Sequence, residues 1–188
     1  MTLQEQIRVF SPFNEQERSD RELMLRHLDR YDDLLYRENP VMHFTASGWV
    51  VSPKRDQVLV VYHNIYQSWS WTGGHADGEE DLFAVALREV REETGLTGLR
   101  PIMPDIFSLE ILGVNAHVKR GKHVCTHLHL NATFLLEADP QLPLRPKPDE
   151  NSAVRWIPAA EVIARSSEPD MQVVYRKLLE KMRELPAK

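Results

Sequence analysis

The stretch REVREETGL, residues 88–96, most constrains what this chain can fold into. Apolar residues recur at helical spacing and predict a helix over 79–94, which Gly95 ends as a C-cap. Glu89, Glu92 and Glu93 then lie at i, i+3 and i+4, so their like charges repel one another. They also crowd the last turns of the helix, where its dipole favours cations. An unfavourable local arrangement of this kind predicts a partner that compensates it.

A divalent cation is the partner that reverses the sign of this repulsion. In projection, Glu89 and Glu93 lie on one edge of the apolar stripe and Glu92 lies one step further round, at the rim of the core. Hard ions such as Mg²⁺ and Mn²⁺ bind carboxylate oxygens, keep several waters and commonly bridge to phosphates. The alternative is a solvated acidic face, which Glu-rich helices often present.

The spacing upstream of the acids favours the metal site. From Gly74 the chain runs through five residues to Glu80, and through seven more to Arg88 and the rest of REVREETGL. This is the pattern of the Nudix box. The chain resembles the Nudix hydrolases across residues 74–96, and more loosely across about residues 42–160.

The resemblance implies both a fold and an activity. The fold is α/β, a Nudix-type α/β/α sandwich with a mixed sheet between helices. The activity is that of a pyrophosphohydrolase acting on acid anhydrides, in which water attacks a diphosphate phosphorus. The substrate would be a small molecule, a nucleoside diphosphate linked to another group. The cofactor would be Mg²⁺, for which Mn²⁺ can substitute, because a metal neutralises the diphosphate and lowers the pKa of bound water.

The resemblance also implies roles for individual residues. The implied metal ligands are Glu89, Glu92, Glu93 and a backbone carbonyl at Gly73 or Gly74. The implied catalytic residues are Glu92 and Glu93 as candidate bases and Arg88 as the partner that orients a carboxylate. Thr72 departs from the pattern, because many family members carry proline before the double glycine.

A further acid is predicted outside the box. Nudix proteins often use a carboxylate in the loop before a strand that ends in Trp, a hydrophobic residue and Pro. Here that strand ends in Trp156, Ile157 and Pro158, and Glu150 is the best match. The alternatives are that the adjacent Asp149 participates, or that Glu150 is a solvated loop acid.

A histidine-rich strand is the second polar feature. In HVCTHLHLNATF, His127 and His129 share one face with other polar residues. If Lys119 pairs with His123 across the turn RGK, that face gains more polar residues and becomes a floor of Asn115, His117, His127 and His129. We interpret the floor as binding a base, sugar or phosphate. Ligation of a transition metal by the HxH pair, or a plain solvated face, are the alternatives.

Trp71 lies next to the glycine loop. Its ring can stack on a base, and we include it among the substrate-binding candidates; the alternative is a core aromatic.

The length, charge and cysteine content of the chain narrow the kinds of protein that it can be. The chain has 188 residues, which is enough for one domain. We expect a single globular Nudix domain over residues 41–188, with residues 1–40 as an N-terminal helical extension packed on it. No apolar run is long enough for a membrane span. The net charge of −5 argues against general nucleic-acid binding. The start does not read as a signal peptide, and the single Cys125 excludes an intrachain disulfide, so we expect a cytoplasmic protein. A homodimer is left open.

Two other functions compete with hydrolysis. The first is a catalytically silent nucleotide sensor or scaffold with the same fold, which would have no need to keep three repelling acids. The second is an isoprenyl diphosphate isomerase, which would require a suitably placed catalytic cysteine, and Cys125 is a poor candidate.

The expected elements are read from apolar periodicity and turn residues. They are a helix within 15–37, a hairpin of 42–52 and 57–64, a glycine-bearing loop over 68–80, strands over 106–119 and 123–138, a strand over 153–157 and a helix over 170–185.

Overall fold

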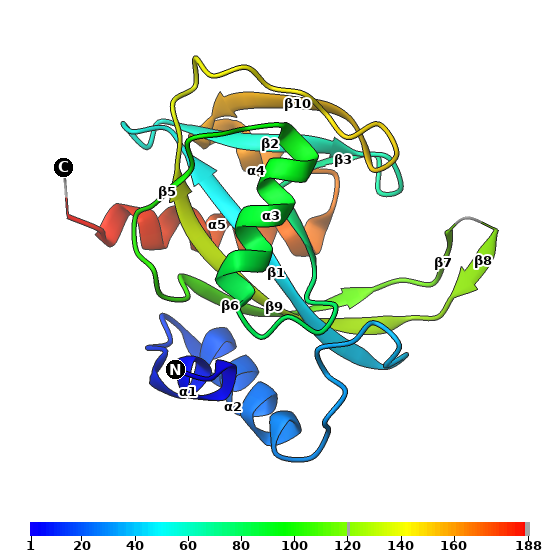
Figure 1. The fold of residues 1–188 in the computed structure, drawn as a ribbon. Helices are drawn as coiled ribbons and strands as arrows, with labels where there is room; N and C mark the ends of the chain where they lie inside the picture. Colours follow the sequence, from blue (N-terminus) through cyan, green and yellow to red (C-terminus); the bar gives the residue numbers. More distant parts are fainter. Residues whose placement is uncertain (120, 187–188) are drawn as a thin grey trace. The chain divides into compact units, whose positions relative to one another are not determined.

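The computed structural model describes residues 1–119 and 121–186. The helices are α1 (Leu3–Val9), α2 (Glu15–Leu28), α3 (Leu82–Thr94), the 3₁₀ turn η1 (Ala159–Glu161), α4 (Val162–Arg165) and α5 (Pro169–Glu184) (Figure 1). Within the described ranges, none of them is both long enough and apolar enough to cross a bilayer.

The strands form a mixed sheet, as predicted. They are β1 (Met42–Val51), β2 (Gln57–His63), β3 (Ser68–Ser70), β4 (Thr72–His75), β5 (Arg100–Pro101), β6 (Ser108–Val114), β9 (His127–Glu137) and β10 (Asn151–Pro158), with β7 (His117–Lys119) and β8 (Lys122–Val124) in a separate ribbon. The hydrogen-bonded order is β10-β2-β1-β9-β5, with β3 on β2, β4 on β1 and β6 on β9. Leu128 N donates to Val41 O and Ala138 N to Val51 O, ten residues further along both strands, so β1 and β9 run parallel.

The chain divides into two compact units. The first comprises Met1–Ser47, Gly73–Ala86 and Asp105–Phe134, and the second comprises Gly48–Thr72, Leu87–Pro104 and Leu135–Lys188. Strands β1 and β9 and helix α3 each contribute residues to both units.

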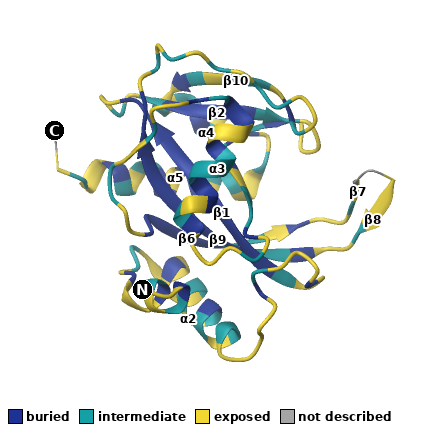
Figure 2. Cartoon of the chain, viewed as in Figure 1, coloured by how far each residue is buried: buried dark blue, intermediate teal, exposed yellow. Residues whose placement is uncertain are grey.

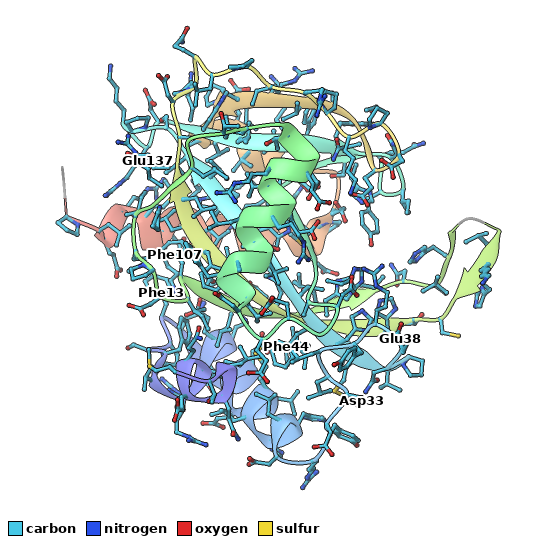
Figure 3. All side chains as sticks on the ribbon, viewed as in Figure 1. Phe13, Asp33, Glu38, Phe44, Phe107 and Glu137 are labelled. Carbon is cyan, nitrogen blue, oxygen red and sulfur yellow. The ribbon has the colours of Figure 1, made fainter. Side chains whose placement is uncertain are left out.

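The first unit packs the N-terminal helices against β6. Its core contains Ile7 and Met24 from the helices together with Phe44 from β1, and Phe44 is labelled in Figure 3. Polar contacts join the same elements: Ser108 Oγ donates to Glu17 Oε1 at 2.7 Å, and Ile111 N donates to Asp20 Oδ2 at 2.8 Å. Because these acids accept hydrogen bonds from β6, the docking of α2 is directional as well as apolar.

The second unit is centred on a buried aromatic cluster. Trp49 of β1 stacks on Tyr175 of α5 with ring centroids 5.5 Å apart, and its Nε1 donates to Met182 Sδ at 2.9 Å. β10 pairs with β2 along its length, with Trp156 opposite Leu59. β1 and β2 are buried over most of their residues (Figure 2), which suits strands rich in valine and other β-branched or aromatic side chains.

The apolar periodicity of the sequence predicted most helices and strands. The predicted and observed elements differ mainly in where they begin and end. The helix expected within 15–37 ends at Leu28, because the Asp-rich segment that follows is unfavourable at a helix C-terminus. Leu34 is nevertheless buried, and its carbonyl accepts a hydrogen bond from Phe44 N at 2.7 Å. The helix expected from residue 79 begins at Leu82 after Asp81, whose Oδ1 accepts from Ala84 N. The segment predicted as a loop over 68–80 contains β3 and β4.

The predicted register of the histidine strand is wrong by one residue. Lys119 lies opposite Lys122 rather than His123, and Val114 lies opposite His127. Arg120 of the connecting turn lies outside the described residues. Leu112 and Val114 therefore share a face with His129 and His127, and Asn115 and His117 do not complete the expected floor.

A buried polar network explains this register. Glu110 Oε2 accepts from Asn131 Nδ2 at 3.0 Å and from Thr133 Oγ1 at 2.9 Å, and Asn131 Oδ1 accepts from Thr45 and Ser47 of β1. Glu110 and Asn131 pair directly across β6 and β9. The alternation of polar and apolar residues did not predict this register, because the polar side chains of this face are buried and form hydrogen bonds with one another.

Candidate active site

Helix α3 positions the acidic residues, and its C-terminus is built as the sequence predicted. Gly95 has φ +66°, the left-handed conformation of a helix C-cap, and its N–H donates to Arg91 O at 2.9 Å. Arg145 N donates to Thr94 O at 2.7 Å. The proline-rich loop is thereby attached to the end of the helix that carries Glu92 and Glu93.

Arg88 pairs with Glu89. Its Nη2 lies 3.0 Å and its Nε 3.3 Å from Glu89 Oε1. The Glu89 side chain is only 12% exposed, so the guanidinium compensates a largely desolvated carboxylate. This contact is consistent with the orienting role that the resemblance implies for Arg88.

The ammonium group of Lys147 contacts the carboxylates of both Glu92 and Glu150. Its Nζ lies 3.2 Å from Glu92 Oε2 and 3.1 Å from Glu150 Oε2. Burial lowers the pKa of Lys147, but hydrogen bonds and charge from Glu150 and Glu92 outweigh it, so the pKa is raised. The structure therefore groups Glu150 with the helix acids, while Asp149 is exposed.

Asn151 holds Glu93. The Asn151 side chain is fully buried, its Nδ2 donates to Glu93 Oε2 at 3.0 Å, and its Oδ1 accepts from Lys147 N at 3.0 Å. Glu93 itself is only 3% exposed. Sequence reasoning missed Asn151 and Lys147, although both lie in the loop segment PKPDEN or beside it, where Glu150 had been singled out.

The Glu89 environment predicts a measurable pH dependence. Burial raises the pKa of Glu89, and the Arg88 hydrogen bond and charge only partly offset it. The stabilisation from a raised folded-state pKa is complete below the unfolded-state pKa and is lost as pH rises through the folded-state pKa. In metal-free buffer, Glu89→Gln should therefore melt above the wild type at pH 7–8, and the difference should shrink toward pH 4.

Thermal unfolding across this pH range measures the effect, with Glu180→Gln on the exposed part of α5 as the control. A Glu89→Gln variant that melts at or below the wild type at pH 8 would show that the Arg88 pair outweighs the burial of Glu89.

A second polar cluster lies in the first unit. His43, His75, His127 and His129 form it, with ring centroids 4.9–5.1 Å apart in every contact recorded between them. Nitrogen atoms of His43, His75 and His129 all lie within 4.8 Å of one another, and this is the only such group of three His, Cys, Asp or Glu residues in the described part of the chain. Burial lowers the pKa of His43. His43 and His75 were not predicted to join the histidine strand.

The remaining substrate-binding candidates lie elsewhere. The Trp71 ring packs edge-on against Tyr175 with ring centroids 5.9 Å apart, and the backbone N–H of Trp71 donates to Tyr175 OH. Burial raises the pKa of Tyr175 above its usual range. Asn115 is exposed, and its carbonyl oxygen contacts His117 Nδ1 at 3.0 Å at the base of the β7–β8 ribbon.

The glycine loop belongs to the first unit and approaches β1 closely. A Cβ at Gly73 would lie 2.5 Å from Ser47 Oγ and 2.7 Å from Ala46 O, so a side chain does not fit there. Gly74 is half-buried on β4. Thr72, where proline was expected, is buried and donates through its Oγ1 to Gly48 O at 3.3 Å. A threonine side chain thus anchors the start of the loop.

Comparisons with known proteins identify the family of the chain. The model of the NUDIX domain matches residues 42–182. The m7GpppN-mRNA hydrolase NUDT17 of Danio rerio is 32% identical over 135 residues, which are 67% of this chain and 42% of the relative. The chain thus spans less than half of that relative's length.

Solved structures show the same fold at low identity. A C. elegans Ap4A hydrolase binary complex has a TM-score of 0.57 at 18% identity, covering 76% of this chain and 98% of the other. RenU, a Nudix hydrolase of M. smegmatis, has a TM-score of 0.57 at 17% identity, covering 78% and 89%. The NUDIX domain of Shewanella oneidensis NrtR with ADP ribose has a TM-score of 0.52 at 18% identity, covering 85% and 96%.

The predicted Nudix-type α/β fold is therefore confirmed. Because the domain model matches most of the chain, including the box over residues 74–96 and the loop that carries Glu150, the chain belongs to the Nudix family.

Proposed function

We propose that the chain is a Mg²⁺-dependent Nudix pyrophosphohydrolase acting on a nucleoside diphosphate derivative. The observation that carries the proposal is the grouping of Glu89, Glu92, Glu93 and Glu150 around Arg88, Lys147 and Asn151. Carboxylate oxygens with cationic and amide partners are hard donors of the kind that Mg²⁺ and, in its place, Mn²⁺ prefer.

The residues of the site have different proposed roles. When bound, the metal neutralises the diphosphate and lowers the pKa of the attacking water. Glu89 and Glu92 are the proposed ligands, with Glu93 as ligand or base. Arg88 fixes the rotamer of Glu89, and Asn151 fixes that of Glu93. Lys147 offsets the charge of Glu92 and Glu150, a role that a bound cation would take over.

Similar proteins support the substrate class. They are an m7GpppN-mRNA hydrolase, an Ap4A hydrolase and a domain bound to ADP ribose, and each of these compounds joins a nucleoside to another group through two or more phosphates. We propose this shared chemistry for the present chain. Trp71, His127 and His129 stay predicted substrate-binding residues, whereas the observed register removes the argument for Asn115 and His117. The extension over residues 1–40, the cytoplasmic location and a homodimer stay predictions.

A substrate screen tests the proposal. Purified protein is incubated with nucleoside diphosphate sugars, dinucleoside polyphosphates, oxidised nucleoside triphosphates and coenzyme-like diphosphates, and products are separated by ion-exchange chromatography. We expect hydrolysis of at least one class with Mg²⁺ or Mn²⁺ and none in EDTA.

The sensor alternative predicts a different outcome. Nucleotide binding detected by calorimetry without turnover of any class, at millimolar Mg²⁺, would overturn the proposed hydrolysis in favour of a silent sensor or scaffold.

A further inference from the structure

The histidine cluster of the first unit lies outside the acidic group and has the composition of a transition-metal site. We propose that His43, His75 and His129 bind one Zn²⁺ ion. Imidazole nitrogens are ligands that Zn²⁺ prefers, whereas Mg²⁺ prefers oxygen. Three strands supply the ligands, since His43 lies on β1, His75 on β4 and His129 on β9. The inference does not depend on the proposed hydrolysis.

His43 supplies an independent observation that points to a ligand. The residue is only 4% exposed, and its Nδ1 contacts Asn39 O at 3.1 Å. A carbonyl can only accept, so Nδ1 carries the proton and the lone pair lies on Nε2. Nε2 is buried and has no hydrogen-bond partner. A buried acceptor left without a donor is unfavourable, and a metal ion would satisfy it.

His127 fixes the tautomer of His129. His127 Nδ1 lies 2.8 Å from Cys125 O and therefore carries the proton, which leaves Nε2 as an acceptor. His129 Nε2 lies 3.1 Å from His127 Nε2 and must donate to it. The lone pair of His129 then lies on Nδ1. Ligating histidines commonly donate their other ring N–H to a neighbour in this way.

The three histidine nitrogens lie somewhat further apart than the ligands of a bound Zn²⁺ ion. Tetrahedral nitrogen ligands at about 2.0–2.1 Å from Zn²⁺ lie roughly 3.4 Å apart, and the three ligand nitrogens here lie within 4.8 Å of one another. A bound ion would draw the three nitrogens together to this spacing. Three protein ligands leave the fourth position for water, and His75 and His129 are only half-buried, which gives an ion access.

The experiment measures metal content and geometry in the full chain. Because the exposed Cys125 can bind Zn²⁺ by itself, all variants carry Cys125→Ser. After metal removal, Zn²⁺ loading and dialysis, we expect one Zn²⁺ per chain by elemental analysis. We also expect visible absorption typical of tetrahedral coordination with Co²⁺, and a raised melting temperature with Zn²⁺ that Mg²⁺ does not reproduce.

Variants locate the ion. His75→Asn and His129→Asn, at half-buried positions, should abolish stoichiometric Zn²⁺ and the Co²⁺ absorption. His127→Asn, the positioning residue, should weaken binding by about 10–100-fold. His123→Asn, on the exposed β8, is the matched control and should bind as the parent does. Absence of bound Zn²⁺ in the parent, or full binding in both His75→Asn and His129→Asn, would overturn the proposal.

Discussion

Glu93→Gln is expected to lower turnover by about 100-fold or more, which corresponds to about 2.7 kcal/mol of transition-state stabilisation. Glu93 is the most buried of the three helix acids, and Asn151 Nδ2 donates to its Oε2 at 3.0 Å. A glutamine can turn its own oxygen toward Asn151 and keep this hydrogen bond. It cannot accept a proton from the attacking water or contribute a negative charge to a cation. The variant therefore removes the chemistry while it preserves the packing.

The stability of the same variant separates catalysis from folding. Removal of a buried negative charge near the C-terminus of α3 should leave the metal-free protein as stable as the wild type or slightly more stable. Thermal unfolding in EDTA and initial rates at saturating substrate are the two measurements, with Glu180→Gln as the surface control. A marked loss of metal-free stability would show that Glu93 is structural.

Local patterns predicted the elements that carry the acids. The stripe of Phe83, Leu87 and Val90 predicted α3, and Gly95 predicted its end. The hairpin of β1 and β2 followed from two β-branched segments around a turn. These features depend on residues a few positions apart, where periodicity and turn chemistry are informative.

Partners distant in sequence could not be predicted in this way. Asn151 and Glu93 are 58 residues apart, and Lys147 and Glu92 are 55 apart. No periodicity links such residues, because their contact depends on how the proline-rich loop attaches to the end of α3. His43 and His75 were missed for the same reason, since they join His129 from two other strands. The register error arose because the prediction aligned polar residues on one face and apolar residues on the other, whereas Leu112 and Val114 lie opposite His129 and His127. Glu110 and Asn131 are buried together on this pair of strands.

Glu150 is the candidate site residue for which sequence and structure supply independent arguments. The resemblance placed a carboxylate in the loop before the Trp-bearing strand, and the structure places Glu150 beside the same ammonium group as Glu92. Its position is set by Asn64 N, which donates to Glu150 O at 2.9 Å, and by its own N–H, which donates to Lys147 O at 3.0 Å. The backbone on both sides of the carboxylate is therefore fixed to neighbouring strands and loop.

Glu150→Gln is accordingly expected to cut turnover strongly with little change in substrate affinity, because a proton acceptor acts in the transition state. Asp149→Asn is the matched control: the side chain is adjacent and exposed, and its neutralisation should do much less. The kcat and KM of both variants, measured at saturating Mg²⁺, separate the cases. A fall in kcat for Glu150→Gln alone assigns the base or an added ligand to the loop. Turnover near the wild-type level for Glu150→Gln would return the role of base to Glu92 or Glu93, and a larger loss in Asp149→Asn would transfer it to Asp149.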